Sequence, residues 1–255
     1  MKALPHIQKL SVHSASLEYV KSGIGYPSIV LVNGFGGPIE CWQKVYAQLE
    51  ELGTVFAYNR LGIGGSSKPS EPQTGDVVVK TLHELLGHAS MKPPYLLVGH
   101  SLGGLFVNLF ARSFPSEVSG AVLLDATAPE DLSVMLAHQG ACQRFIQRAL
   151  DAVFGKNEFS ETEHVAHTVD LIHQSGPFPA IPLIVVTGAK PAMSWAIPTP
   201  ILAARSENQR KLAVLSPQGK QILASRSGHF PQFTEPAVVV EAVREAISSA
   251  ARKYA

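Results

Sequence analysis

The stretch Gly-His-Ser-Leu-Gly at positions 99–103 constrains the fold of this chain more strongly than any other part of the sequence. An apolar run at 95–98 precedes it, and a helix-like apolar run continues after it to Phe114. A serine between two glycines, at a sharp turn from a strand to a helix, stands clear of the sheet, and the first N–H groups of the helix point toward its hydroxyl. We therefore predict that Ser101 is a nucleophile. The alternative is an ordinary turn without chemistry.

Short apolar runs alternate with helical patterns along most of the chain. A continuous apolar run such as 28–32 is typical of a parallel strand that is buried on both faces. Strands that alternate with helices predict an α/β fold with a mostly parallel central sheet and helices on both faces. The other predicted strands are 7–12, 15–20, 54–58, 95–98, 119–124, 181–187 and 220–224, and the predicted helices are 39–52, 75–90, 105–114, 200–215 and 235–254.

Residues 127–180 differ in character from the rest of the chain. This segment is richer in helix formers and histidine, and it contains no convincing strand. We therefore expect a small helical insertion at 127–180, with residues 1–126 and 181–255 forming the α/β core. The strand pattern resumes at 181–187 after the insertion.

The composition excludes several classes of protein. Of the 255 residues, 45% are hydrophobic and 16% are charged, which allows a large core and argues against disorder. The net charge is +1 and no basic cluster stands out, so nucleic acid is not the expected partner. Cys41 and Cys142 form neither a disulfide framework nor a metal-ligand pattern. The sequence shows no signal-peptide pattern and no membrane-span candidate, so we expect a cytoplasmic protein.

A nucleophilic serine needs a base, a group that orients the base, and N–H donors for the oxyanion. Ligands and chemistry in α/β sheets lie at the carboxyl ends of the strands. His229 follows the last predicted strand, in a loop where Gly228 allows a tight turn, and we predict that it is the base. The alternative is a histidine bonded to a loop carbonyl. We expect the side chain of His100 to point away from Ser101 and to be structural.

Backbone N–H groups of two loops are the candidate oxyanion donors. The Leu102 N–H comes with the serine turn, and the Phe35 N–H lies in the loop after strand 28–32, where Gly34 and Gly36 let the backbone approach a substrate. The interpretation of these glycines as a nucleotide site is weak, because the third glycine of a dinucleotide fingerprint and the Gly-Lys-Ser/Thr of a phosphate loop are absent. No strong metal motif surrounds the insertion's histidines, so we predict no metal site.

In chain order, the glycine-rich stretches at 33–37 and 60–66, the serine motif at 99–104 and the pair at 228–229 resemble the α/β-hydrolase family. The resemblance covers nearly the whole chain. It implies a serine hydrolase without a cofactor, in which the insertion at 127–180 is a helical cap and the pocket lies between core and cap. A serine nucleophile argues against the family's aspartate-nucleophile dehalogenases and epoxide hydrolases.

The chain departs from the family pattern at three places. Asn33 stands where the family usually has histidine, and Asn59 stands where it often has aspartate. Both residues are expected to support the neighbouring loops. The family's usual acid follows strand 181–187, but the segment 187–195 contains no carboxylate.

A minority of the family takes the acid from the end of the preceding strand. Asp125 stands there, 24 residues after Ser101, and we predict that it is the acid. An aspartate at that place can also serve a structural role. Glu130 and Asp131 are alternative acids, and a slower dyad without an acid is a further alternative.

We predict that the chain cleaves a small or medium apolar ester through an acyl-enzyme at Ser101. Phe35 and Trp195 are the expected lining of an apolar pocket for this small-molecule substrate. Two alternatives are related serine chemistry, such as a perhydrolase, lactonase or C–C hydrolase, and a ligand-binding or signalling protein with weak turnover. Substrate identity and oligomeric state are not determined by the sequence.

Overall fold

The computed structural model describes residues 3–137, 159–190 and 199–252, and a sheet of eight strands lies at its centre. The strands are ordered β1-β2-β4-β3-β5-β6-β7-β8. β2 pairs antiparallel with β1 and with β4, and all other neighbouring strands are parallel. The bounds are Gln8–Val12 (β1), Ala15–Ser22 (β2), Ser28–Val32 (β3), Thr54–Tyr58 (β4), Tyr95–His100 (β5), Val118–Leu124 (β6), Leu183–Gly188 (β7) and Gly219–Ala224 (β8). The predicted mostly parallel sheet is confirmed.

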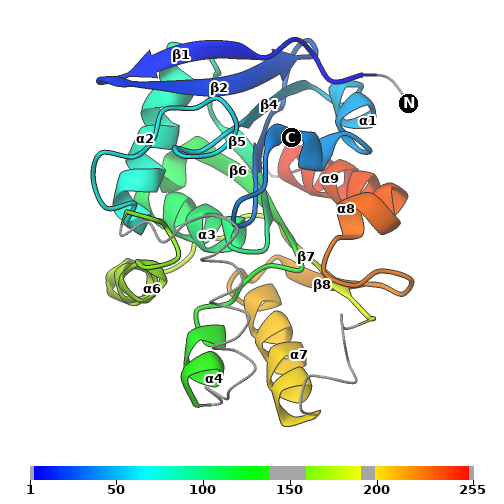
Figure 1. Ribbon diagram of the computed structural model, residues 1–255. Helices are drawn as coiled ribbons and strands as arrows, with labels where there is room; N and C mark the ends of the chain where they lie inside the picture. Colours follow the sequence, from blue (N-terminus) through cyan, green and yellow to red (C-terminus); the bar gives the residue numbers. More distant parts are fainter. Residues whose placement is uncertain (1–2, 138–158, 191–198, 253–255) are drawn as a thin grey trace.

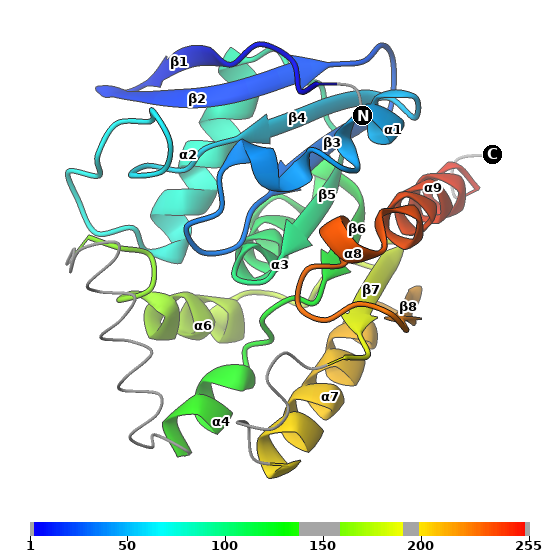
Figure 2. The ribbon, with the colours of Figure 1, turned by 45° about the vertical axis from the view of Figure 1, so that its right-hand side comes forward.

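Helices cover both faces of this sheet (Figures 1 and 2). The helices α2 (Gly75–His88) and α3 (Gly103–Ser113) pack on one face, together with the end of α7 (Thr199–Ala213). The opposite face carries α1 (Tyr46–Glu50) and α9 (Pro236–Ala251). The remaining short elements are the 3₁₀ turns η1 (Ile39–Trp42) and η2 (Pro115–Glu117) and the helix α8 (Pro231–Thr234).

The strand β3 shows why the sheet is buried on both faces. Val30 and Val32 point into the core beneath α2 and α3, whereas Ile29 and Leu31 point into the core beneath α1 and α9. Successive side chains of a strand alternate between faces, so a strand covered on both sides must be apolar throughout. This is the physical reason for the continuous apolar runs in the sequence.

The segment 39–52 differs from the single helix that its pattern predicts. It forms the 3₁₀ turn η1 and then the short helix α1. Ile39 and Trp42 are fully buried in η1, and Val45 is fully buried in the turn between η1 and α1. The predicted helix is therefore divided into two short elements that pack against the sheet.

The segment 127–180 contains α4 (Asp131–Ala137) and α6 (Val165–Gln174) in its described part. α6 packs against α2 and α3 through the buried side chains of Val169 and Ile172. Its separation as a cap domain stays a prediction. Because β3 to β8 run parallel, the loops that follow them meet at one edge of the sheet.

Candidate functional site

Ser101 lies directly after β5 on a backbone with φ of 51°, a conformation that is rare for residues other than glycine. The turn is crowded on both sides. A Cβ atom at Gly103 would lie 2.3 Å from the carbonyl oxygen of Val32, and a Cβ atom at Gly99 would lie 2.8 Å from that of Gly103. The two glycines of the motif therefore allow the close approach of β3, β5 and α3 that holds the serine in this turn.

His229 stands in the loop after β8 and links Ser101 to Asp125 by hydrogen bonds. The Ser101 hydroxyl lies 2.9 Å from His229 Nε2, and His229 Nδ1 lies 2.7 Å from Asp125 Oδ2. The three residues are separated by 128 and 104 positions in the sequence. In the neutral imidazole with a proton on Nδ1, Nε2 accepts the hydroxyl proton, which is the arrangement that general-base activation of a serine requires.

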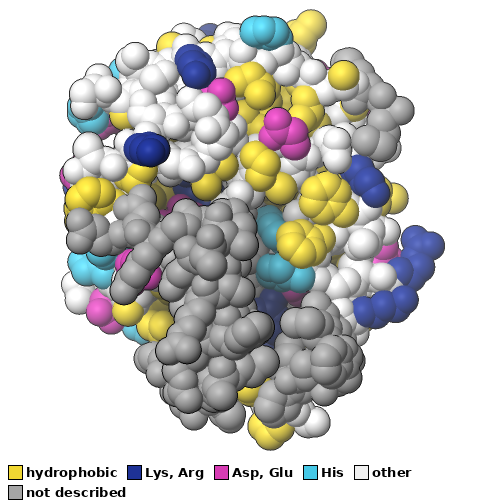
Figure 3. Space-filling model, in the orientation of Figure 1, with side chains coloured by type: hydrophobic (Ala, Val, Ile, Leu, Met, Phe, Trp, Pro, Cys, Tyr) yellow, Lys and Arg dark blue, Asp and Glu magenta, His cyan; other side chains and the backbone are white. Residues whose placement is uncertain are grey.

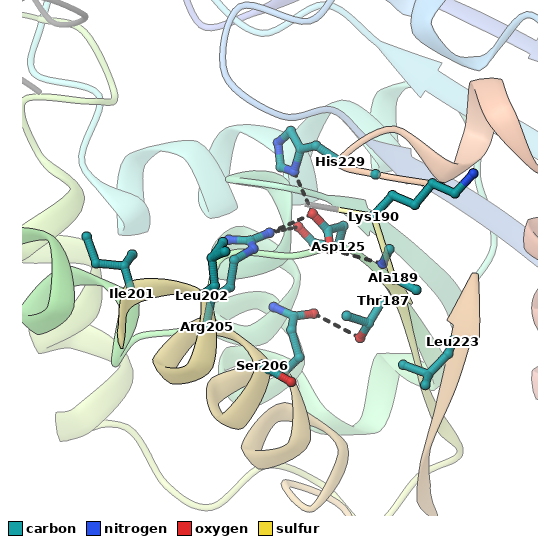
Figure 4. A pocket seen from close by; sticks show the side chains of 13 residues that line it. Asp125, Thr187, Ala189, Lys190, Ile201, Leu202, Arg205, Ser206, Leu223 and His229 are labelled. Carbon is teal, nitrogen blue, oxygen red and sulfur yellow. Dashed lines mark hydrogen bonds and ion pairs between the residues drawn. The ribbon is translucent and has the colours of Figure 1, made fainter. Parts of the chain in front are cut away.

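Asp125 follows β6, and each of its polar groups has a partner. Its backbone φ is 41°, and its N–H donates to the carbonyl of Val186. The N–H of Gly188 donates to Oδ1 at 3.2 Å. Arg205 on α7 donates to Oδ2 at 2.6 Å and to the carbonyl oxygen of Asp125 at 3.1 Å (Figure 4).

The environment of Asp125 keeps its carboxyl group ionised. Burial on its own would raise the pKa, but the hydrogen bond from His229 and the charge of Arg205 outweigh it, so the pKa is lowered from its ordinary value. No pattern in the sequence indicates either contact of Arg205 with Asp125. The two residues are 80 positions apart, and Arg205 lies on a helix of ordinary composition. The alternative acid Asp131 instead accepts hydrogen bonds from the N–H of Ala128 and from Asn208.

His100 holds the loop that carries His229. Its Nε2–H donates to the carbonyl of His229 at 2.8 Å, because a carbonyl can only accept. Burial lowers the pKa of His100 to about 4, with a further contribution from nearby His229, so the ring is neutral at pH 7. This hydrogen bond is consistent with the structural role expected for His100, and the sequence did not indicate its contact with His229.

The loop after β3 lies against Ser101. A Cβ atom at Gly34 would stand 2.9 Å from the Cβ atom of Ser101, so this backbone passes beside the serine. Phe35 is half-buried in this loop, and Leu102 is buried at the start of α3. Of the two residues whose N–H groups we predicted as oxyanion donors, Leu102 directly follows Ser101, and Phe35 directly follows Gly34, which lies beside Ser101. Their role stays a prediction.

A buried arginine fixes the same loop. Arg60 donates to the carbonyl oxygens of Asn33 and Gly34, each at 2.6 Å. Its other side forms a bidentate pair with Glu161, with both distances at 2.6 Å, and the guanidinium lies over the ring of Phe106. Glu161 belongs to the segment 127–180. Its ion pair with Arg60 therefore links this segment, through Arg60, to the loop beside Ser101. Sequence reasoning did not identify Glu161.

Asn33 and Asn59 occupy different environments. The Asn59 side chain accepts from the N–H of Ile39 at 2.8 Å and donates to Glu18 at 2.9 Å, which ties the residue after β4 to η1 and to β2. The Asn33 side chain is buried and has no hydrogen-bond partner within the described part of the chain. The supporting role expected for Asn59 is thus visible in its contacts, whereas that of Asn33 is not.

A cavity of about 600 Å³ opens beside Asp125 and His229 (Figure 4). Thr187, Lys190 and Arg205 contribute to its lining, and Ser101 does not. On the surface, histidine side chains appear beside a group of hydrophobic side chains (Figure 3). Phe230, next to His229, is 48% exposed. Trp195, the second predicted pocket residue, lies outside the described residues.

The described residues hold no group of three or more His, Cys, Asp or Glu side chains arranged to bind a metal ion. Their helices include none that is both long and apolar enough to cross a membrane.

The sequence model of the alpha/beta hydrolase family matches residues 29–242. This range includes all of β3 except its first residue, β4 to β8, and every residue of the hydrogen-bond chain from Ser101 to Asp125. The chain belongs to the alpha/beta hydrolase family, and it is a hydrolase by that membership.

Individual relatives agree with this assignment. The uncharacterized protein YqjL of Bacillus subtilis (strain 168) is 27% identical over 242 residues, which cover 92% of this chain and 89% of YqjL. An uncharacterized protein of Mycobacterium tuberculosis is 33% identical over 124 residues, or 49% of this chain and 36% of that protein. The crystal structure of a thermophilic esterase from Thermogutta terrifontis superimposes with a TM-score of 0.67 at 19% identity, covering 96% of this chain and 99% of the esterase. At that identity the likeness concerns the fold.

Proposed function

We propose that this hydrolase is a serine esterase that cleaves a small or medium apolar ester through an acyl-enzyme on Ser101. The hydrogen-bond chain from the Ser101 hydroxyl through His229 to Asp125 carries the proposal. A serine, a histidine and a buried carboxylate at these distances form the arrangement by which unrelated hydrolases activate a serine.

The first half of the reaction forms the acyl-enzyme. His229 Nε2 takes the hydroxyl proton as Ser101 Oγ attacks the ester carbonyl, and the N–H groups of Phe35 and Leu102 stabilise the oxyanion. Asp125 holds the proton on Nδ1 and stabilises the imidazolium that forms. The alcohol then leaves with the proton from Nε2.

The second half restores the serine. A water molecule gives its proton to His229 Nε2 and attacks the acyl carbonyl, so the acid is released and Ser101 Oγ recovers its proton. Each half transfers one proton to and from His229, and no cofactor is required. The same steps would open a lactone, which is an internal ester.

A protein that only binds a ligand was an alternative because the usual acid position is empty of carboxylates. The contact between Asp125 and His229 favours turnover over this alternative, since it supplies the orienting group that a base needs. The apolar side chains beside His229, with Phe230 exposed at 48%, favour an apolar substrate over a charged one.

Labelling with a fluorophosphonate probe tests the proposal. We expect the native protein to react at one serine, Ser101→Ala to lose the reaction, and Ser70→Ala, at an exposed loop serine, to keep it. Labelling that persists in Ser101→Ala, or no labelling of the native protein, would remove the proposal. Hydrolysis of esters with short, medium and long acyl chains, and of lactones, then defines the substrate class.

A further inference from the structure

Arg205 contacts the predicted acid at two different atoms. Its Nη2 lies 2.6 Å from Asp125 Oδ2 and 3.1 Å from the carbonyl oxygen of the same residue. The carboxylate therefore cannot turn without breaking the first bond, and the peptide cannot turn without breaking the second. The Asp125 backbone has φ of 41°, a conformation that aspartate adopts at a cost and that needs such restraint.

Oδ2 is also the atom that contacts His229. His229 Nδ1 and Arg205 Nη2 lie 2.7 Å and 2.6 Å from this one oxygen, while Oδ1 is bonded to the N–H of Gly188. The side chain of Asp125 is 6% exposed and that of Arg205 is 35% exposed. Without the guanidinium, a nearly buried carboxylate would keep only the imidazole and one backbone N–H as partners. Burial then favours its neutral form, which no longer selects the His229 tautomer with a proton on Nδ1.

Other side chains of α7 support this placement of Arg205. Gln209 donates to the carbonyl oxygen of Ala126 at 2.6 Å, and Asn208 donates to Asp131 Oδ1 at 2.8 Å. One face of α7 thus binds the segment that follows β6 through polar contacts. Arg205 Nη1 lies 4.0 Å from Asp131, so the second carboxylate shares the charge without a close contact.

We propose that Arg205 is a positioning residue that holds Asp125 in the orientation in which it aligns His229 with Ser101. This inference rests on the proposed serine hydrolase. Residues 187–195, where the family usually has its acid, contain no carboxylate. The helix α7, which follows them, instead supplies a guanidinium to Asp125, which follows the neighbouring strand β6.

The rate of fluorophosphonate labelling tests this role. We expect Arg205→Ala to react about 10²-fold more slowly, the loss typical of a misplaced catalytic group. Guanidinium ions, well below denaturing concentrations, should restore part of the rate, because the cavity of about 600 Å³ that Arg205 lines gives access to its place. The control is Arg210→Ala on the same helix, whose exposed side chain pairs with Glu207. It should retain the native rate and ignore guanidinium.

The Asp125→Asn background separates positioning from general support of the fold. If Arg205 acts through the carboxylate, Arg205→Ala should slow labelling by less than about threefold once that carboxylate is absent. Equal slowing in both backgrounds, without a response to guanidinium, would overturn the inference. So would an Arg205→Ala protein that labels at the native rate.

A spectroscopic measurement keeps this test independent of turnover. The proton of His229 Nδ1 in its hydrogen bond to Asp125 should give a low-field resonance that Arg205→Ala shifts and guanidinium restores. If the native protein fails to label at all, the proposed function falls and this resonance alone decides the role of Arg205. A resonance that Arg205→Ala leaves unchanged would then contradict the inference.

Discussion

Asp125 combines backbone strain, burial and a negative charge in one residue. It adopts a left-handed backbone, is 4% exposed, and keeps a lowered pKa although burial acts to raise it. The hydrogen bond from His229 and the charge of Arg205 outweigh the effect of burial on this pKa. A buried carboxylate with this many partners is retained at a cost in strain and desolvation, which suits a residue that orients a base.

Replacement of Asp125 by asparagine should lower the turnover rate by about 10⁴-fold, because the amide favours the wrong histidine tautomer while its shape fits the same space. Ester hydrolysis measures the loss, and circular dichroism checks that the fold is intact. Asp170→Asn, at an exposed position of α6, is the matched control. A folded Asp125→Asn protein with the native rate would exclude Asp125 as the acid.

His100 makes the stability of the protein depend on pH. Its pKa is about 4 in the folded protein, against 6.5 for the free side chain, so between these values the unfolded chain binds a proton that the folded protein does not. Stability from neutral His100 is present above pH 6.5 and declines as the pH falls toward 4. The shift corresponds to about 3 kcal/mol.

The variant His100→Gln removes this titration and keeps an N–H donor for the His229 carbonyl. We expect its free energy of unfolding, measured with denaturant, to fall less than that of the native protein between pH 6.5 and 4. His173→Gln, at an exposed position, should keep the native slope. Identical slopes for His100→Gln and the native protein would show that His100 is not held neutral by burial.

At the scale of elements, the pair of Arg60 and Glu161 joins two parts of the chain. Arg60 contributes its guanidinium to the carbonyls of the loop after β3, and Glu161 neutralises that buried charge from the segment 127–180. The side chains are 4% and 10% exposed. The position of this segment and the shape of the predicted oxyanion loop therefore depend on the same guanidinium.

Glu161→Gln should lower the free energy of unfolding by about 3–5 kcal/mol, because it leaves a buried arginine without its counter-charge. Glu163→Gln, an exposed neighbour, should change it little. The double variant Arg60→Leu with Glu161→Leu separates the effect on stability from the effect on the loop. We expect it to be more stable than Glu161→Gln, because no buried charge is left without a partner. We expect its ester hydrolysis to be slower than that of the native protein, because the loop carbonyls lose their donor. Native activity in this double variant would contradict a positioning role for Arg60.

Uniform burial explains why several strands could be predicted from the sequence. β3 and β5 to β7 were found because a strand covered on both faces must be apolar throughout. The single helix expected at 39–52 was wrong, because apolar residues three positions apart, such as Ile39 and Trp42, fit a 3₁₀ turn as well as an α-helix, and the pattern did not show the break between η1 and α1. Propensity is a weak determinant where tertiary contacts are strong.

At the scale of the whole molecule, parallel strands bring distant loops to one edge of the sheet. This topology allowed Ser101, His229 and Asp125 to be predicted as neighbours, since each follows a different strand. Arg205 and Glu161 could not be predicted in the same way. They reach the site from the side of a helix and from the segment 127–180, where no strand end fixes their place.

The central claim is that Ser101 becomes acylated during turnover. Intact-protein mass spectrometry of a slowly deacylating ester reaction tests it most directly. We expect a transient species heavier by one acyl group, located on the peptide that contains Ser101, and we expect this species to be absent from Ser101→Ala. Ester hydrolysis by Ser101→Ala at the native rate, or an acyl group carried on another residue, would contradict the account.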